Sequence, residues 1–153
     1  MNIIVGIDTG VNTGLAVRDC GSKSFLSVET VKIHRAMDVV RQLDASNPGG
    51  VLVLMEDARQ RKWIPKEVSW SQAKGRAMGA GSVKRDSGIW EDFLKDTGIR
   101  CIAVAPKDNA TKLSAEVFSA LTGWKGRTSE HGRDAAMLVH RYVALQTFGS
   151  HER

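Results

Sequence analysis

Short apolar runs and helical repeats follow one another along the chain and predict a mixture of strands and helices. Apolar residues dominate 2–8 and 13–19, and the turn residues TGVN between them predict a β-hairpin. A third strand is expected over 24–33, where apolar and polar residues partly alternate. The stretch 34–45 has apolar positions at helical spacing and stops at the breaker SNPGG, which predicts a helix.

The second half of the chain alternates strands with helices. The run VLVLME from Val51 is short, rich in β-branched residues and framed by Gly, as expected of a central strand covered on both faces. Further elements are a mainly helical stretch at 66–97 interrupted near GAGS, a strand at 99–105, a helix over TKLSAEVFSALTG ending at Gly123, and a last helix over 129–146 capped by Thr128 or Ser129. This order predicts one α/β domain over 1–153, with a mixed five-stranded sheet that is first antiparallel and later parallel.

Composition is that of an ordinary globular domain. The 153 residues are 42% hydrophobic and 25% charged, enough to bury a core without disulfides or metals. Cys20 and Cys101 lack metal-ligand spacing and are expected to be reduced thiols, with Cys101 buried in a strand. There is neither an apolar run of about 18 residues nor a secretory leader, so we expect a cytoplasmic protein without a membrane partner.

Positive charge gathers after the predicted central strand. The formal net charge is +5, and between Arg59 and Arg76 six Lys and Arg residues accompany the single acid Glu67. A solvated face would explain the charges alone, but interleaved Trp side chains also suit stacking on bases beside phosphate contacts. The candidate DNA-binding residues in this part of the chain are Arg59, Arg61, Lys62, Trp63, Lys84 and Arg85.

Two apolar runs end on a carboxylate. Asp8 closes the first strand and Glu56 the fourth, and if these strands pair in parallel the two acids emerge side by side, about 4.8 Å apart. Two such carboxylates repel unless one is protonated or a divalent cation such as Mg²⁺ or Mn²⁺ is bound. Asp57 points to the opposite side of an extended chain and is left out of this site. Asp86, Glu91 and Asp92 lie in a charged helical stretch and are expected on a solvated face.

The last helix adds two more polar side chains. Its expected core-facing stripe consists of Ala135, Leu138, Tyr142 and Leu145. One turn earlier the same stripe reaches His131 and Asp134, an i, i+3 pair on one face. The alternative is that the two residues merely cap the start of the helix, and an acid after a strand is often an ordinary turn residue. Two acids at strand ends and two polar residues on one helical face are harder to explain as separate structural residues, so the combination favours a metal site.

Four blocks of sequence have a recognisable order and spacing: GIDTGVNTGLAV, VLVLMED, APKDNATKLSAEVFSALTG and GRTSEHGRDAAMLV. They resemble the RuvC family of Holliday-junction resolvases, particularly its compact phage-encoded members, within the ribonuclease H-like superfamily. The resemblance covers nearly the whole chain, and HGRDAAMLV combined with the other blocks is its most specific part. It implies a ribonuclease H-like fold and a metal-dependent endonuclease of the bacterial cytosol that resolves branched DNA and leaves 5′ phosphates.

The resemblance also implies roles for single residues. The family holds two divalent metals, Mg²⁺ or Mn²⁺, with an acid on strand one, an acid on strand four and a pair on the last helix. These positions fall on Asp8, Glu56, His131 and Asp134. The family often has Asp where this chain has His131, and an imidazole there makes the site less negative and favours Mn²⁺.

Phosphate contacts and the oligomeric state follow from the same resemblance. Lys107 and Lys112 match family lysines that hold phosphates, and Lys112 joins the expected catalytic residues. Family members insert an aromatic side chain into the junction, and Trp63 is its counterpart here, although farther from Glu56 than the family pattern has it. The family pairs as a homodimer through the helix after strand four, here KEVSWSQAKGRAMGAGS at 66–82, where Val68, Gly75 and other small residues allow close approach.

Two other function classes stay open at this point. A binding module with an inactive site would bind branched DNA without cutting it. Actin-like and sugar-kinase ATPases also begin with a strand followed by an Asp-Gly-Thr-Gly loop, but they need a second domain with a second loop, and this chain shows no internal repeat.

Overall fold

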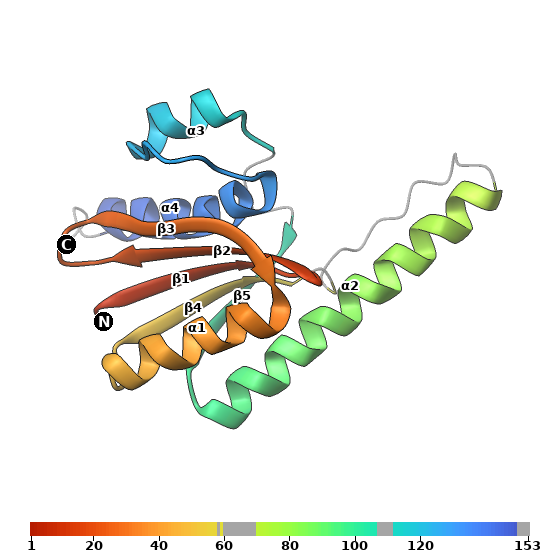
Figure 1. Cartoon of the computed structure of the whole chain (residues 1–153), viewed down its shortest axis with the longest axis horizontal. Coiled ribbons are helices and arrows are strands. Elements are labelled where there is room, and N and C mark those ends of the chain that lie inside the picture. Colours follow the sequence, from red (N-terminus) through yellow and green to blue (C-terminus); the bar gives the residue numbers. More distant parts are fainter. Residues whose placement is uncertain (58, 60–69, 107–111, 150–153) are drawn as a thin grey trace.

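The computed structural model describes residues 1–57, 59, 70–106 and 112–149, with the backbone alone at 70–80 and 83. These residues form a five-stranded sheet with helices on both faces (Figure 1). The elements are β1 (Ile3–Asp8), β2 (Asn12–Asp19), β3 (Ser24–Lys32), α1 (Ile33–Ser46), β4 (Val51–Glu56), α2 (Trp70–Thr97), β5 (Arg100–Val104), α3 (Ala115–Thr122) and α4 (Glu130–Gly149). The α/β class and the strand and helix order predicted from sequence are confirmed.

The sheet is mixed, with the strand order β3-β2-β1-β4-β5. β1 pairs antiparallel with β2, and β2 with β3, whereas β1 and β4, and β4 and β5, pair in parallel. The hairpin between β1 and β2 is as predicted, and the Thr13 hydroxyl donates to the Gly10 carbonyl at 2.7 Å across its turn. β4 lies between two parallel strands and is buried over Val51–Met55, as expected of a central strand.

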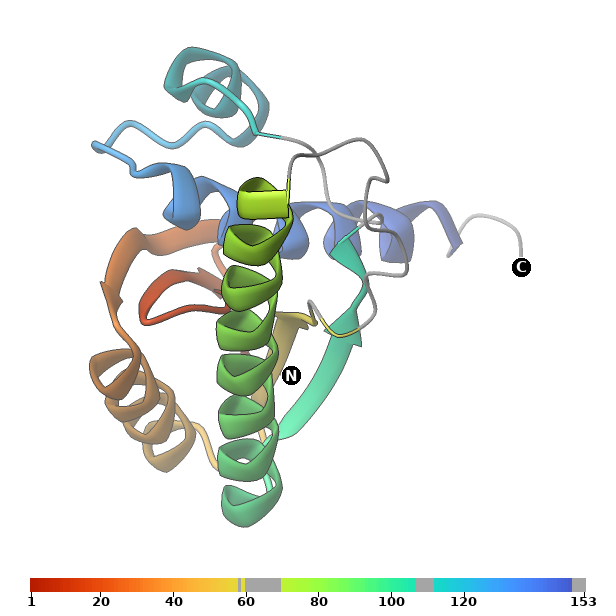
Figure 2. The same cartoon turned by 90° about the vertical axis from the view of Figure 1, so that its right-hand side faces the viewer.

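Alternate residues of β1 serve two separate layers of the core. Ile3, Val5 and Ile7 pack with α1 and α2, where the Trp90 and Phe93 rings meet edge to face at 5.6 Å. The other face of the sheet, which includes Ile4 at 1% exposure, is covered by α4. α3 lies beyond α4 and adds a fully buried Phe118 to this second layer (Figure 2). Side chains that alternate along a strand therefore meet different helices.

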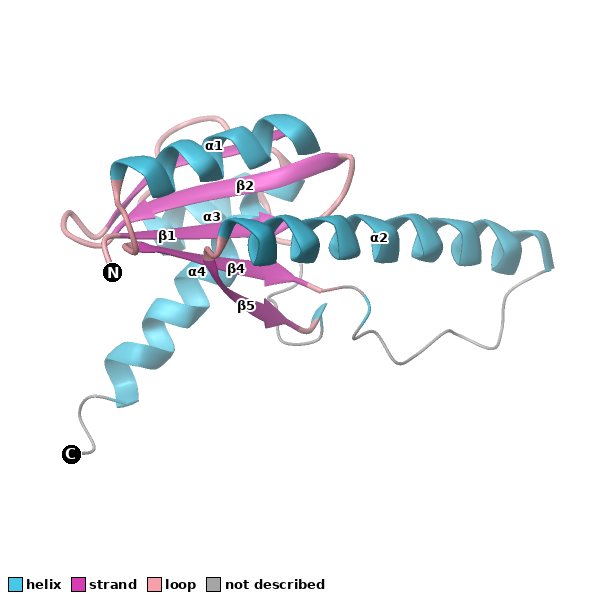
Figure 3. Ribbon diagram, turned by 90° about the horizontal axis from the view of Figure 1, so that it is seen from below, coloured by secondary structure: helices cyan, strands magenta, loops and turns pink. Residues whose placement is uncertain are grey.

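Two residues that the sequence placed in the core are exposed. Cys101 is exposed because β5 is the edge strand and has a neighbour on one side only. Leu145 is 71% exposed because the carboxyl-terminal turns of α4 extend past the sheet (Figure 3). The buried part of the predicted stripe is its amino-terminal half, where Ala135 and Leu138 are at most 3% exposed.

Helix boundaries follow local capping groups. α3 begins later than expected because the Ser114 hydroxyl accepts a hydrogen bond from the Val117 amide, and it ends as predicted at the left-handed Gly123. Ser129, one of the two predicted caps of α4, accepts from the Gly132 amide at 3.2 Å. The expected interruption near GAGS is wrong, since α2 runs unbroken from Trp70 to Thr97. Over the described part of the chain, no helix is both long and apolar enough to span a membrane.

The first turns of α4 lie directly on the sheet, backbone against backbone. A Cβ atom at Gly14 in β2 would sit 2.0 Å from the His131 carbonyl oxygen, and one at Gly6 in β1 would sit 2.1 Å from the Ala135 carbonyl oxygen. A Cβ at Gly132 would lie 3.0 Å from a backbone nitrogen of β3. Only glycine allows this approach, so these positions fix how near α4 comes to the carboxyl end of β1.

Gly14→Ala tests this contact. The added methyl group overlaps a helix carbonyl, so α4 must move, and we expect a loss of about 3 kcal/mol or more in the free energy of unfolding. Gly88→Ala is the matched control, because Gly88 lies in α2 with open space around it and alanine favours helix by about 0.5–1 kcal/mol. Urea unfolding of both variants measures the difference. A Gly14→Ala protein as stable as the wild type would contradict the close contact.

Candidate metal centre

The acids that end β1 and β4 are neighbours in the sheet. Asp8 and Glu56 are partners in the parallel register, so the condition under which the sequence placed the two acids side by side is met. Both belong to the set of alternate residues that faces α4, since Ile4 and Leu54, an even number of residues away, are buried in that layer. The strand ends therefore present two carboxylates to the amino-terminal end of α4.

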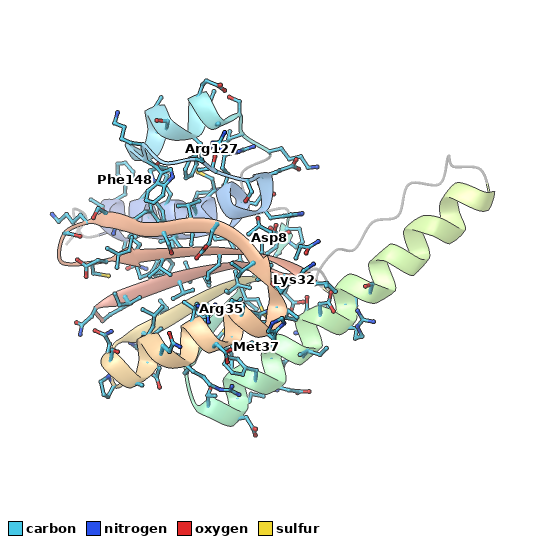
Figure 4. The ribbon with its side chains drawn as sticks, viewed as in Figure 1. Asp8, Lys32, Arg35, Met37, Arg127 and Phe148 are labelled. Carbon is cyan, nitrogen blue, oxygen red and sulfur yellow. The ribbon has the colours of Figure 1, made fainter. Side chains whose placement is uncertain are left out.

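α4 completes a three-residue cluster with Asp8. Ligand atoms of Asp8, His131 and Asp134 all lie within 4.8 Å of one another. His131 Nδ1 is 2.9 Å from Asp8 Oδ2; when Asp8 is ionised its carboxylate can only accept, so Nδ1 is then the donor. Figure 4 shows Asp8 at the end of β1, facing the first turn of α4. Glu56 is outside this three-residue group, although it acts electrostatically on both acids.

Burial makes the two clustered carboxylates reluctant to ionise. Desolvation raises the pKa of Asp8 from 3.8 to about 6, against the lowering effect of the His131 hydrogen bond, and the nearby Glu56 adds to the rise. Desolvation also raises the pKa of Asp134, followed by repulsion from Glu56 and Glu130. A nearby cation stabilises the ionised form of acids crowded in this way, because it offsets the repulsion that helps to raise their pKa values.

Asp57 takes no part in the cluster and belongs to the opposite layer, as its place after Glu56 predicted. Its carboxylate is buried and accepts two hydrogen bonds of 2.8 Å from the Arg59 guanidinium. Arg59 also binds Glu91 of α2, which in turn pairs with Lys95 at 2.7 Å. These carboxylates raise the pKa of Arg59, so its charge is compensated within the protein.

A second polar contact joins α2 to the strand ends. Thr9, directly after Asp8, places its hydroxyl 3.3 Å from both the Glu56 carbonyl and the buried Ser87 hydroxyl. Asp86, expected on a solvated face, is 2% exposed and pairs with Arg85 at 3.1 Å. The prediction for Asp86 is wrong because this turn of α2 packs against the sheet, whereas Asp92 is exposed as expected.

Lys112 reaches the rim of the cluster. Its Nζ lies 2.8 Å from Glu130 Oε1, and this pair raises the pKa of Lys112, with smaller contributions from Asp134 and Asp8. Glu130 was not among the residues singled out from sequence. The signal was present, since Glu130 precedes Asp134 by four residues and therefore shares its helical face.

The structure describes three of the residues that were predicted to bind DNA. Lys84 and Arg85 are exposed on α2, and Arg59 is held by the two carboxylates described above. Arg61, Lys62, Trp63 and Lys107 lie outside the described residues, so their contacts with DNA stay predictions.

The donor set suits a divalent cation. Two carboxylates and an imidazole converge, and they come from chain segments 123 residues apart in sequence. Carboxylate oxygens suit Mg²⁺, and adding a ring nitrogen moves the preference toward Mn²⁺. Clustered acidic side chains also occur without a metal, so a bound ion here is a proposal that rests on this chemistry.

No protein-family model and no curated protein matches this sequence.

Asp8→Asn should stabilise the metal-free protein. Folded Asp8 keeps its proton up to about pH 6 and unfolded Asp8 only to about 3.8, so stability falls as the pH rises between these values. Asparagine does not ionise, so in EDTA at about pH 7.5 the variant should be more stable by up to about 3 kcal/mol, and the gain should vanish near pH 4. Urea unfolding measures both.

Asp19→Asn serves as the control of opposite sign. Hydrogen bonds from Ser22 lower the pKa of the partly exposed Asp19, so removing its charge should bring no gain at neutral pH. Equal stability of Asp8→Asn and wild type at neutral pH in EDTA would contradict the burial cost at Asp8.

Adding Mn²⁺ in place of EDTA should stabilise the wild type more than Asp8→Asn, because a ligand that binds only the folded state adds to the free energy of unfolding.

Proposed function

We propose that this protein is a metal-dependent endonuclease that cuts four-way junctions or other branched DNA. The observation that carries the proposal is the convergence of Asp8, His131 and Asp134, with Glu56 in register beside Asp8. A desolvated acid whose pKa is raised to about 6 costs stability at neutral pH, and acids of this kind are common in functional sites. Sites that bind cations and act on phosphates need such a cluster.

The resemblance to RuvC resolvases supports the choice of substrate and of fold. The residues that its motifs single out at the two strand ends and the last helix lie at one end of the sheet. The mixed five-stranded sheet with helices on both faces is compatible with a ribonuclease H-like fold. The proposal therefore extends to that fold and to the family itself.

Each residue of the site has a proposed role. Asp8, Asp134, His131 and Glu56 would hold Mg²⁺ or Mn²⁺, two ions per chain if the family pattern applies. The metal would supply Lewis-acid activation of water and neutralise charge at the scissile phosphate. The hydrogen bond from Nδ1 to Asp8 orients the His131 ring, and exposed Lys112 would contact a phosphate of the bound strand.

Cleavage of a matched substrate panel tests this proposal. We expect the wild type with Mg²⁺ or Mn²⁺ to cut labelled four-way junctions, three-way junctions or flaps in preference to linear duplex. Asp8→Asn and Asp134→Asn should lower the rate by at least about 100-fold, with junction affinity within a few-fold, because the change affects the chemistry more than remote phosphate contacts.

Asp92→Asn is the control for cleavage, since Asp92 is an exposed acid on α2 that is not a member of the cluster. It should cut at the wild-type rate. If the wild type binds junctions and cuts none of them with either metal, the protein is a binding module. If Asp8→Asn cuts normally, the residues assigned to the metal are wrong.

The proposed enzyme is a homodimer, because paired nicks in a junction of two-fold symmetry need two active sites. The amino-terminal half of α2 extends away from the sheet, which leaves it accessible to a second copy (Figures 1 and 3). Gly75, one of the small residues proposed for this contact, falls in the part of α2 described by its backbone only, and Val68 lies outside the described residues.

Sedimentation at micromolar concentration tests the dimer. We expect a species of twice the 16.7 kDa of one chain, both free and bound to a junction. A single-chain mass in both states would contradict paired nicking by one complex.

A further inference from the structure

The ion pair between Lys112 and Glu130 lies near the candidate metal centre, close enough for Asp134 and Asp8 to act electrostatically on Lys112. Glu130 immediately precedes His131 in the first turn of α4, and its carboxylate contacts Lys112 Nζ at 2.8 Å. The side chains are 78% and 49% exposed, so both groups remain in contact with water. Such a pair is easily exchanged for another partner.

The backbone under this pair is held more firmly than the pair itself. Arg133 Nε donates to the Leu113 carbonyl at 2.8 Å, and its Nη1 donates to the Thr128 hydroxyl at 2.9 Å. The first bond ties Leu113, the residue next to Lys112, to α4, and the second holds the Arg133 guanidinium in place. The lysine is therefore anchored at its backbone while its ammonium group can change partner.

We propose that Glu130 is a positioning residue that holds the Lys112 ammonium beside the Asp8–His131–Asp134 cluster until a DNA phosphate replaces it. This inference rests on the proposed function, because it names how that site receives its substrate. A phosphate is a strong acceptor for the lysine, and its contact releases counterions from DNA. Glu130 keeps a favourable position without Lys112, since an acid in the first turn complements the helix dipole.

The exchange makes a specific prediction about binding. In the wild type, a DNA phosphate must displace Glu130 before it contacts Lys112. Part of the binding free energy of the phosphate contact is therefore cancelled by the loss of the ion pair. Glu130→Gln removes this competition and should tighten binding by about two- to five-fold, the range expected for one exposed ion pair. The gain should disappear when Lys112 is also replaced, because it arises only through that lysine.

Fluorescence anisotropy with a labelled four-way junction in EDTA tests the exchange without cleavage. The proteins are wild type, Glu130→Gln, Lys112→Gln, the double variant and Glu116→Gln. Glu116 is the matched control, because it is an exposed acid in the first turn of α3 and its replacement changes the net charge equally. Salt titration should show that Lys112→Gln lowers the slope of log K against log salt by about one.

The outcomes separate the two proposals. The exchange is supported if Glu130→Gln binds more tightly than Glu116→Gln and the gain is lost in the double variant. It is overturned if the two glutamate variants bind alike, if the gain persists without Lys112, or if Lys112→Gln leaves the salt slope unchanged. A wild type that binds no DNA would instead reject the proposed function. Thermal unfolding of each variant detects any loss of folded protein.

Discussion

The direct contact between the backbone of α4 and the sheet is the constraint on which the candidate site depends. Gly14 and Gly6 lack the Cβ atoms that would stand 2.0 and 2.1 Å from carbonyl oxygens of α4. If either position carried a side chain, α4 would lie farther from the sheet, and His131 would lose its 2.9 Å contact with Asp8. Burial of Ala135 and Val139 against the same strands stabilises the close position. Gly6 and Gly14 thus contribute to the candidate site only by letting α4 approach the sheet closely.

The ends of β1 and β4 serve two faces of the sheet at once. Glu56 faces α4 and the cluster, while Asp57, the next residue, faces α2 and binds Arg59. The Asp57 amide also donates to the Val104 carbonyl at 2.8 Å, which ties the end of β4 to β5. Alternation along one strand therefore separates a candidate reactive carboxylate from a structural one. The ion pairs of Asp57 and Arg59 steady the backbone that carries Glu56.

Charge is arranged differently at the centre of the site and at its rim. In the centre, desolvation raises the pKa values of Asp8 and Asp134, so a bound cation would stabilise their ionised forms. At the rim, Lys112 and Glu130 are exposed and paired, and each shifts the pKa of the other toward its charged form. A partly buried centre whose carboxylates resist ionisation, beside an exposed and exchangeable ion pair, is an arrangement suited to a site that admits a highly charged ligand.

Sequence by itself determined the element order, the carboxylates at the ends of two apolar runs, and the helical face shared by His131 and Asp134, because these depend on residue patterns within single elements. The tertiary structure supplied the parallel pairing of Asp8 with Glu56, which the sequence analysis took only as a condition. It misjudged Cys101, Leu145 and Asp86, whose exposure depends on which strand is the edge and where each helix leaves or meets the sheet. The role of Arg59 as a partner of two carboxylates was equally invisible, since Glu91 lies 32 residues away. Only the tertiary structure decided these points, because burial and ion pairing arise between elements whose separation the local pattern does not encode.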